Sequence, residues 1–463
     1  MEEKKEAREE RNREKLANGD WVMAEFYASW CPHCKRMQPI VEEFKKAIAF
    51  AGDIVVIHLG INDTDPRDWP NYRDFFIQDY RALIDSFRVA NSRCRILIAR
   101  LTPIADRHPR FESGTRDWHD EIQLAIENIA KYAGVQLIDF HAPLYPYPFM
   151  LPDAVHPNVE GAEILAKTVY EGITGDFGGL RMSPLYTDNM VLQHGKPLTI
   201  QGTANAGDRI TVSIAHQKQK VVTGMDGKWS VTLSPLKAGG PYTLVISSGK
   251  QKLTYGNVLA GEVWLCSGQS NMEFYLNWSA TAKRDVAKAA NDNIRLFDMK
   301  ARWRTDAVEW NASVLDSLNH LQYYKDTEWT VCSPQTAGNF SAVAYYFGKM
   351  LQDSLQVPVG LICNAIGGSP TEAWIDRSSL EYHFPAILRN WTKNDFIQDW
   401  VVDVLLSMLK SQPISCSVIP MNLVICMNRV FFLCNNSPLK ALFGIRENRM
   451  RIIVRRTKSC LNY

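Results

Sequence analysis

Short runs of apolar residues alternate with helical patterns in the first third of the chain. The runs at residues 54–59, 95–101 and 135–139 are rich in Ile, Val and Leu, which is typical of parallel strands that are buried on both faces. Residues 72–89 and 120–132 lie between these runs and favour helices. Strand and helix therefore alternate, and this order predicts a parallel α/β layer.

Residues 179–256 have a different periodicity, because apolar and polar residues alternate there at every second position. Gly, Asp and Asn turns separate the alternating stretches, and this pattern predicts a small β-sandwich. The stretches are residues 198–202, 209–214, 227–233 and 242–246.

A second α/β piece is predicted at residues 257–400. Apolar runs at residues 262–266 and 357–364 favour buried strands, and residues 342–352 between them favour a helix. The expected fold class is therefore α/β, with a β-sandwich between this piece and the α/β piece at residues 51–178.

The two ends of the chain break these patterns. Residues 401–463 open with an apolar stretch that Pro420 and Arg429 interrupt, which makes a poor membrane span, and they close with a basic segment. We expect foreign or out-of-frame sequence there, with a genuine C-terminal extension as the alternative. Residues 1–50 start with a charged helical run instead of the apolar core of a signal peptide, so the chain as written is expected in the cytoplasm.

Composition narrows the function classes. The 463 residues are 46% hydrophobic and 22% charged, as in a soluble globular protein. A net charge of +2 without a basic stripe disfavours a nucleic-acid partner, and no membrane partner is expected. The ten cysteines form no regular disulfide framework, and a single C-x-x-C pair argues against a zinc ribbon, so no metal is predicted. Oligomeric state is not specified.

The candidate chemistry begins at Ser270, in the Gly-Gln-Ser-Asn-Met segment that follows the apolar run at residues 262–266. A serine on a sharp turn after a buried strand is how a hydrolase exposes a nucleophile at the carboxyl edge of an α/β sheet. Gln269 and Asn271 flank the serine with amide donors that could hold the negative oxygen of a tetrahedral intermediate. An ordinary polar strand-to-helix turn is the alternative interpretation.

Several motifs in the right order resemble the sialate O-acetylesterase family. Residues 256–273 resemble its first catalytic block, and residues 364–375 resemble its second, with Gly367 and Gly368 as further oxyanion donors. The resemblance runs from about residue 180 to about residue 400. It implies a serine carbohydrate esterase that removes O-acetyl groups from sialic acid or a related sugar through an acetyl-enzyme, with no cofactor. Members of the family are usually periplasmic or secreted.

Two further motifs resemble the SGNH, or GDSL-type, hydrolases. They are Gly-Ile-Asn-Asp at residues 60–63 and Asp-Ala-Val-His-Pro-Asn at residues 153–158, and they imply a flavodoxin-like α/β/α layer. An aspartate and a histidine three residues apart can hydrogen-bond, so Asp153 would orient His156 as the general base. Asn62 and an N–H near Gly60 would donate to the oxyanion. Plain turns are the alternative for both motifs.

The first fifty residues carry a separate motif, Trp-Cys-Pro-His-Cys-Lys, that resembles the active site of thioredoxin-like proteins over about thirty residues. A cysteine at a helix N-terminus has its thiolate stabilised by the helix dipole, so Cys31 and Cys34 are a candidate redox pair. A truncated fragment without redox activity is the alternative.

Neither hydrolase-like piece is complete in sequence. No Gly-Asp-Ser block precedes Gly60, and only His320 and His383 follow Ser270, neither with an aspartate three residues before it. The preferred interpretation is two incomplete modules in tandem, one without its serine and one without its base. The alternative functions are a thiol–disulfide oxidoreductase and an inactive carbohydrate-binding protein.

Overall fold

The computed structural model describes residues 51–303, 311–369, 371–389 and 440–443. The chain divides into two compact units, Met1–Thr174 and Gly175–Tyr463. The candidate redox pair Cys31 and Cys34 lies outside the described residues, as does the predicted tail apart from residues 440–443.

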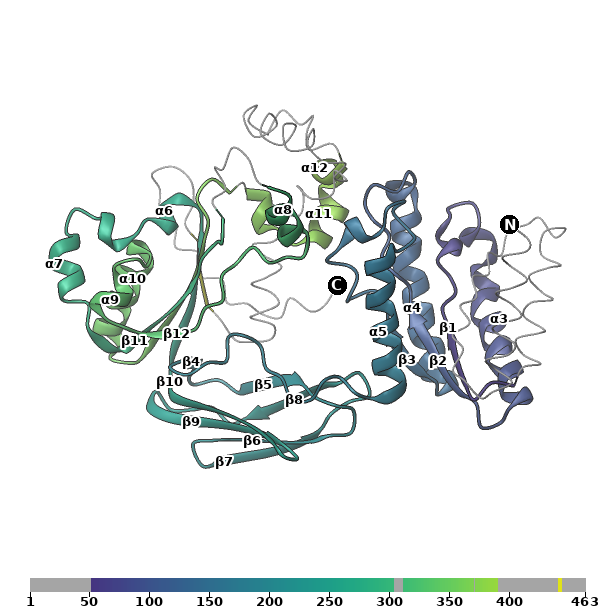
Figure 1. The fold of residues 1–463 in the computed structure, drawn as a ribbon, viewed down its shortest axis with the longest axis horizontal. Coiled ribbons are helices and arrows are strands. Elements are labelled where there is room, and N and C mark those ends of the chain that lie inside the picture. The colour runs from purple at the N-terminus through teal and green to yellow at the C-terminus, as the bar shows by residue number, and fades with distance from the viewer. Residues whose placement is uncertain (1–50, 304–310, 370, 390–439, 444–463) are drawn as a thin grey trace. The chain divides into compact units, whose positions relative to one another are not determined.

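The first unit contains a three-stranded parallel sheet in the order β1-β2-β3 (Figure 1). The strands are β1 (Ile54–Ile57), β2 (Arg95–Arg100) and β3 (Gln136–Asp139). The helices are α3 (Trp69–Ala90), α4 (Thr115–Ala133) and α5 (Val159–Thr174), with short 3₁₀ turns η1 (Asn62–Thr64), η2 (Phe111–Ser113) and η3 (Pro148–Met150). Each predicted strand and helix is present, and the observed helices are longer than predicted.

Alternate residues of β2 enter two different cores, because successive side chains of a strand point to opposite faces. Ile96 and Ile98 pack with residues of α3 and α4, whereas Leu97 and Ala99 pack with residues of α5. The sheet is therefore covered on both faces, which confirms the predicted α/β/α layering.

The second unit begins with a β-sandwich, as the period-two pattern predicted. Its strands are β4 (Val191–Gln193), β5 (Leu198–Thr203), β6 (Arg209–Ile214), β7 (Gln217–Val222), β8 (Lys228–Leu233) and β9 (Gly239–Ser248). Strands β5 and β8 pair with each other, and β6 pairs with both β7 and β9. Inward residues from both sheets share one core, for example Ile200 of β5 and Val212 of β6.

Strand β10 (Gln251–Gly268) continues across the predicted boundary at residues 256 and 257. Its first part pairs antiparallel with β9, and its second part pairs parallel with β13 (Val359–Ala365). The register with β9 shifts between Tyr255 and Ala260, where the strand passes from the sandwich to the α/β layer. A single strand therefore connects the core of the sandwich to the sheet that carries Ser270.

The α/β sheet of the second unit has the order β12-β11-β13-β10, and β14 also pairs with β10. The new strands are β11 (Asn291–Met299), β12 (Trp329–Cys332) and β14 (Lys440–Phe443), the last of which comes from the predicted tail. The helical elements are α6 (Ser270–Glu273), η4 (Leu276–Trp278), α7 (Ala282–Ala287), α8 (Ala312–Asn319), α9 (Pro334–Ala337), α10 (Ala342–Leu355), η5 (Thr371–Trp374), α11 (Arg377–His383) and α12 (Pro385–Arg389).

No helix in the described part of the chain has the length and apolar character needed to cross a bilayer.

Candidate active site

Ser270 lies at the carboxyl end of β10, where the strand gives way to the short helix α6. Gly268 has a φ of 158°, and Gln269 forms the N-cap of α6, so the chain turns sharply at this point. The side chain of Ser270 is exposed, whereas Ser267 three residues earlier is fully buried and its hydroxyl has no hydrogen-bond partner among the described residues. The accessible hydroxyl at the bend is therefore that of Ser270.

The loop after β13 lies directly against Ser270. The Ile366 N–H donates to the Gly268 carbonyl at 3.0 Å, which joins the ends of the two strands. A methyl group placed on Gly367 would lie 3.8 Å from both Cα and Cβ of Ser270. The carboxyl ends of neighbouring parallel strands meet at one edge of a sheet, and this edge is where the sequence placed the two glycines of the second block.

Glu273 connects the serine turn to this glycine loop. Its carboxylate Oε2 accepts a hydrogen bond from the Gly367 N–H at 2.5 Å. The N–H that the sequence proposed as an oxyanion donor is thus already bonded to a carboxylate, and Gly368, with a φ of 78°, is the exposed member of the pair. The sequence motif contained Glu273, but periodicity gave no reason to assign it a role.

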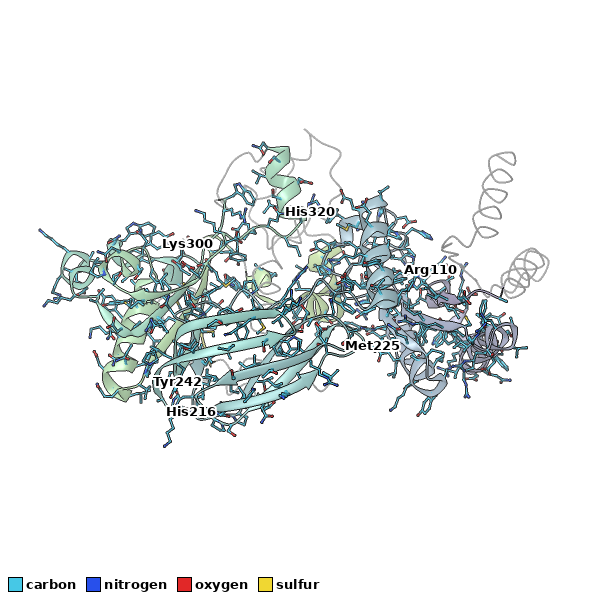
Figure 2. All side chains as sticks on the ribbon, turned by 60° about the horizontal axis from the view of Figure 1, so that its bottom comes forward. Arg110, His216, Met225, Tyr242, Lys300 and His320 are labelled. Atoms are coloured by element: carbon cyan, nitrogen blue, oxygen red, sulfur yellow. The ribbon has the colours of Figure 1, made fainter. Side chains whose placement is uncertain are left out.

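Charged groups from β11 lie beside the same edge. Asp298 and Lys300 are joined by an ion pair of 3.1 Å, and Lys300 (Figure 2) also donates to the Asn339 carbonyl at 2.9 Å. Burial raises the pKa of the Asp298 carboxyl; Lys300 opposes this effect, and the Glu273 carboxylate adds to it. The charges of Lys300 and Glu273 therefore both act on the Asp298 carboxyl.

The predicted amide donors flank the serine, as their positions in the sequence require. Asn271 is exposed and Gln269 is half-buried. The backbone carbonyl of Gln269 accepts from the N–H groups of Met272 and Glu273 at 2.9 Å each, which fixes the turn. Within residues 51–303, 311–369 and 371–389, no side chain hydrogen-bonds to the Ser270 hydroxyl.

The predicted Asp–His pair forms in the first unit. Nδ1 of His156 lies 2.6 Å from Oδ2 of Asp153, and the backbone N–H of His156 donates to Oδ1 of Asp153 at 2.7 Å. Desolvation raises the pKa of Asp153, but these hydrogen bonds outweigh it and lower the pKa to about 2. Both side chains are more than half exposed, so the imidazole is oriented and accessible.

Gly60 and Asn62 also lie at the carboxyl edge of the first unit's sheet, directly after β1. Gly60 has a φ of 117°, and a Cβ there would meet Ile122 at 3.0 Å, so both backbone conformation and close packing favour glycine. Asn62 begins η1, and its side chain is exposed, as a hydrogen-bond donor to substrate requires.

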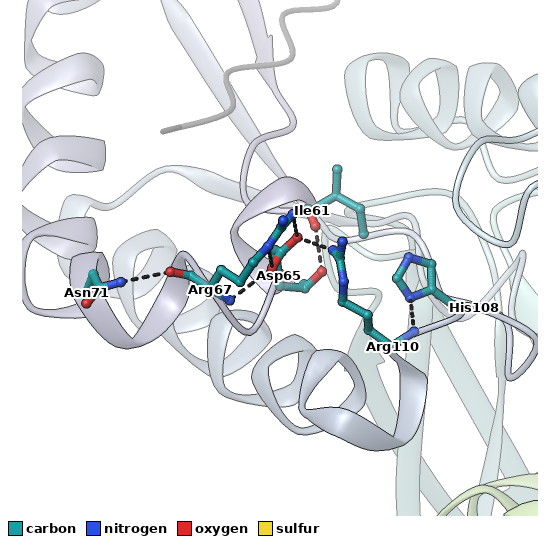
Figure 3. A network of polar contacts seen from close by, with 7 residues as sticks. Ile61, Asp65, Arg67, Asn71, His108 and Arg110 are labelled. Carbon is teal, nitrogen blue, oxygen red and sulfur yellow. Dashed lines mark hydrogen bonds and ion pairs between the residues drawn. The ribbon is translucent and has the colours of Figure 1, made fainter. Parts of the chain in front are cut away.

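A polar network fixes the loop that follows Asn62 (Figure 3). The carboxylate of Asp65 accepts from Nε and Nη2 of Arg67 at 3.0 and 2.8 Å, and it also pairs with Arg110. The hydrogen bond from Arg67 is the main cause that lowers the pKa of Asp65. The backbone N–H of Arg110 in turn donates to Nδ1 of His108 at 3.3 Å. These contacts join the η1 loop to the segment before η2.

The structure also shows an Asp–His pair in the second unit that the three-residue spacing did not predict. Nδ1 of His320 lies 3.5 Å from Oδ1 of Asp316 and 2.8 Å from its backbone carbonyl oxygen (Figure 2). The spacing is four residues instead of three, because the pair spans the last turn of α8. No group of three His, Cys, Asp or Glu side chains suited to a metal ion occurs in the part of the chain that the structure describes.

Comparison with known proteins assigns both units. Residues 31–164 match the GDSL-like lipase/acylhydrolase family, and residues 260–397 match the sialic acid-specific acetylesterases, a carbohydrate esterase family. One segment of the chain is therefore similar to the GDSL-like family, and a second segment is similar to the sialic acid-specific acetylesterases. The GDSL-like match includes residues 153 and 156, and the acetylesterase match includes residues 270 and 367.

Individual relatives cover only part of the chain. Sialate O-acetylesterase of Rattus norvegicus is 33% identical over 217 residues, which are 42% of this chain and 38% of that protein. An acetylxylan esterase of Xylanibacter ruminicola is 32% identical over 146 residues, 28% of this chain and 30% of that protein. The structure of a carbohydrate acetylesterase from Xanthomonas citri is 33% identical and covers 44% of each chain, with a TM-score of 0.38. This chain thus spans less than half of each of these proteins.

A shorter similarity concerns protein disulfide-isomerases. The enzyme of Hordeum vulgare is 35% identical over 66 residues, which are 14% of this chain and 12% of that protein. The candidate redox cysteines themselves lie outside the described residues, so the thioredoxin-like interpretation stays a prediction.

Proposed function

We propose that this chain is a carbohydrate O-acetylesterase that uses Ser270 as its nucleophile. The observation that carries the proposal is an exposed serine at the bend after a buried parallel strand, with the Gly367 loop against it. The named relatives act, by their names, on O-acetylated sialic acid or on acetylated xylan, which supports an O-acetylated sugar as substrate.

The proposed reaction is acyl transfer in two steps. The hydroxyl oxygen of Ser270 attacks the acetyl carbonyl carbon and loses its proton to a base, and the sugar oxygen leaves with a proton as the acetyl-enzyme forms. Water then attacks the acetyl-enzyme, which releases acetate and restores the serine. The amides of Gln269 and Asn271, together with the backbone N–H groups at the start of α6, are the donors proposed for the oxyanion.

Gly367 contributes to this site by its position. Because its N–H is bonded to Glu273, it holds the loop after β13 against the serine turn. Glu273 is therefore proposed as the positioning residue that keeps the nucleophile and the glycine loop in fixed geometry.

His156 and His320 are candidates for the proton-accepting role, because each lies beside an aspartate three or four residues earlier in the chain. His156 with Asp153 is the base proposed for the GDSL-like domain, on the short hydrogen bond and the three-residue spacing. His320 with Asp316 is the corresponding candidate in the second unit, on a longer contact.

The test is acetate release from an O-acetylated sialic acid by the full chain. Ser270→Ala is expected to lower the rate by about a thousandfold or more, because the attacking oxygen is lost. Ser267→Ala is the matched control: it removes a buried hydroxyl without a partner three residues away, so activity is expected to stay close to wild type. Equal rates for wild type and Ser270→Ala would contradict the serine mechanism.

A further inference from the structure

Two exposed aromatic rings follow the serine turn. Phe274 is 41% exposed and Trp278 is 61% exposed. Of the tryptophans in residues 51–303, 311–369 and 371–389, Trp278 is the only one that is exposed; the others are buried or half-buried. Single exposed apolar side chains are common on protein surfaces, but here two exposed rings lie in contact with each other.

The rings have a defined mutual arrangement. The centroids of Phe274 and Trp278 are 5.7 Å apart with an interplanar angle of 75°. The Tyr275 ring lies 4.4 Å from that of Trp278, and Nζ of Lys300 lies 5.0 Å from the Tyr275 centroid. Trp278 is thus supported by Tyr275, while the nearly perpendicular planes of Phe274 and Trp278 offer two apolar surfaces to one ligand.

The backbone fixes these rings relative to the nucleophile. The N–H of Phe274 donates to the carbonyl oxygen of Ser270 at 3.0 Å, so the first ring starts one helical turn after the serine. Leu276 is fully buried, and its N–H donates to the Phe340 carbonyl at 2.9 Å. The N–H of Asn277 donates to the Gly338 carbonyl at 2.9 Å. The segment that carries both rings is therefore anchored to the core at its centre.

We propose that Phe274 and Trp278 form a platform that binds the sugar ring of the O-acetylated substrate while its acetyl group lies at Ser270. A pyranose has faces of C–H groups, and these faces can contact a flat aromatic surface while the hydroxyl groups stay in water. Binding through a part of the substrate that does not react helps to orient the ester for attack. The inference rests on the proposed esterase function for the identity of the reacting group.

The test separates recognition of the sugar ring from the chemistry of the ester. Two substrates are compared in the full chain: an O-acetylated sialic acid, and vinyl acetate, an acetyl ester without a ring. Trp278→Ala is expected to raise the KM for the sugar ester about tenfold and to leave kcat/KM for vinyl acetate within about twofold of wild type. Phe274→Ala is expected to have the same effect but a smaller one, and Trp278→Phe is expected to restore much of the affinity.

Tyr132→Ala is the matched control, because it removes a ring of similar exposure, 74%, at the end of α4 in the other unit. An unchanged KM for the sugar ester in Trp278→Ala would overturn the platform. An equal loss on both substrates would also overturn it, since the ring would then support the serine turn instead of the sugar.

A binding measurement distinguishes failure of the proposed esterase function from failure of the platform. If wild type releases no acetate from either ester, the proposed function is wrong, and the platform is tested by calorimetric titration with the same O-acetylated sialic acid. Weaker binding by Trp278→Ala than by wild type and Tyr132→Ala would support the platform. Equal affinity in all three proteins, or no binding by wild type, would overturn it.

Discussion

The two units place different candidate groups for serine hydrolysis at the same position in their folds, the carboxyl edge of a parallel sheet. In the first unit, the carboxyl edge of the sheet carries an oriented imidazole, with His156 2.6 Å from Asp153. In the second, that edge carries an exposed serine, Ser270, with Gly367 against it. The comparison shows that parallel topology supplies the same edge in both units, and that the residues in the loops decide which polar side chains lie there.

The units also fix their site loops by different means. The first unit uses a charged network, in which one carboxylate, Asp65, holds the two arginines Arg67 and Arg110. In the second unit, the Glu273 carboxylate accepts from the backbone N–H of Gly367, and the Ile366 N–H donates to the Gly268 carbonyl. The loop of the second unit is thus held through its backbone groups, whereas that of the first is held through charged side chains.

The prediction with the largest expected effect tests whether Ser270 acts without His156. Ser270, Glu273 and Gly367 all belong to the second unit, so His156→Ala is expected to lower acetate release far less than the roughly thousandfold loss expected for Ser270→Ala. Both variants are measured on the same O-acetylated sugar, with His320→Ala in parallel. If His156→Ala lowered the rate of acetate release as much as Ser270→Ala, one imidazole would serve both units. The proposed contrast between the two units would then be wrong.

The second prediction concerns the pH dependence of stability and a buried histidine of the first unit, His58. Burial, with a smaller contribution from His119, lowers the pKa of His58 from 6.5 to about 4. Between these values the unfolded chain binds more protons than the folded chain, so this group reduces stability as pH falls from about 6.5 to about 4. His58→Gln is expected to remove a pH-dependent loss of about 3 kcal/mol across that range.

The measurement is the free energy of urea unfolding of His58→Gln relative to wild type, at about pH 7.5 and about pH 4. The difference between variants is used because Asp63, whose pKa burial raises to about 6, changes stability in the opposite direction over the same range. His216→Gln, at an exposed turn of the sandwich (Figure 2), is the control. The same difference at both pH values would contradict the assignment to His58.

The smallest expected effect concerns the hydrogen bond between Glu273 and the loop after β13 in the second unit. Glu273→Ala removes the acceptor for the Gly367 N–H and is expected to lower kcat about tenfold with little change in KM, because the loop but not the sugar platform is released. Glu273→Gln keeps an acceptor oxygen and is expected to retain most of the activity. Equal losses in the two variants would assign the effect to the charge of Glu273 instead of to its hydrogen bond.

Local sequence determined most of the elements and the residues at their ends. Apolar runs and period-two alternation located all strands of the first sheet, most strands of the sandwich, and β10 and β13 of the second sheet, because burial on one or two faces leaves a periodic pattern that needs no knowledge of the partner. They did not locate β11 or β12. The short-range pairs could also be predicted: Asp153 and His156 lie on one turn, and Ser270 follows its strand directly. Such geometry depends on a few neighbouring backbone angles.

Contacts between distant segments were decided only by the tertiary structure. Strand β10 is one continuous strand that pairs with both β9 and β13, although the sequence predicted a domain boundary within it. Glu273 meets Gly367 across 94 residues, and the Ile366 N–H meets the Gly268 carbonyl at the same edge of the sheet. Each contact requires the packing of whole elements, because hydrophobic burial is not directional, and the sheet order alone sets which loops meet at its edge.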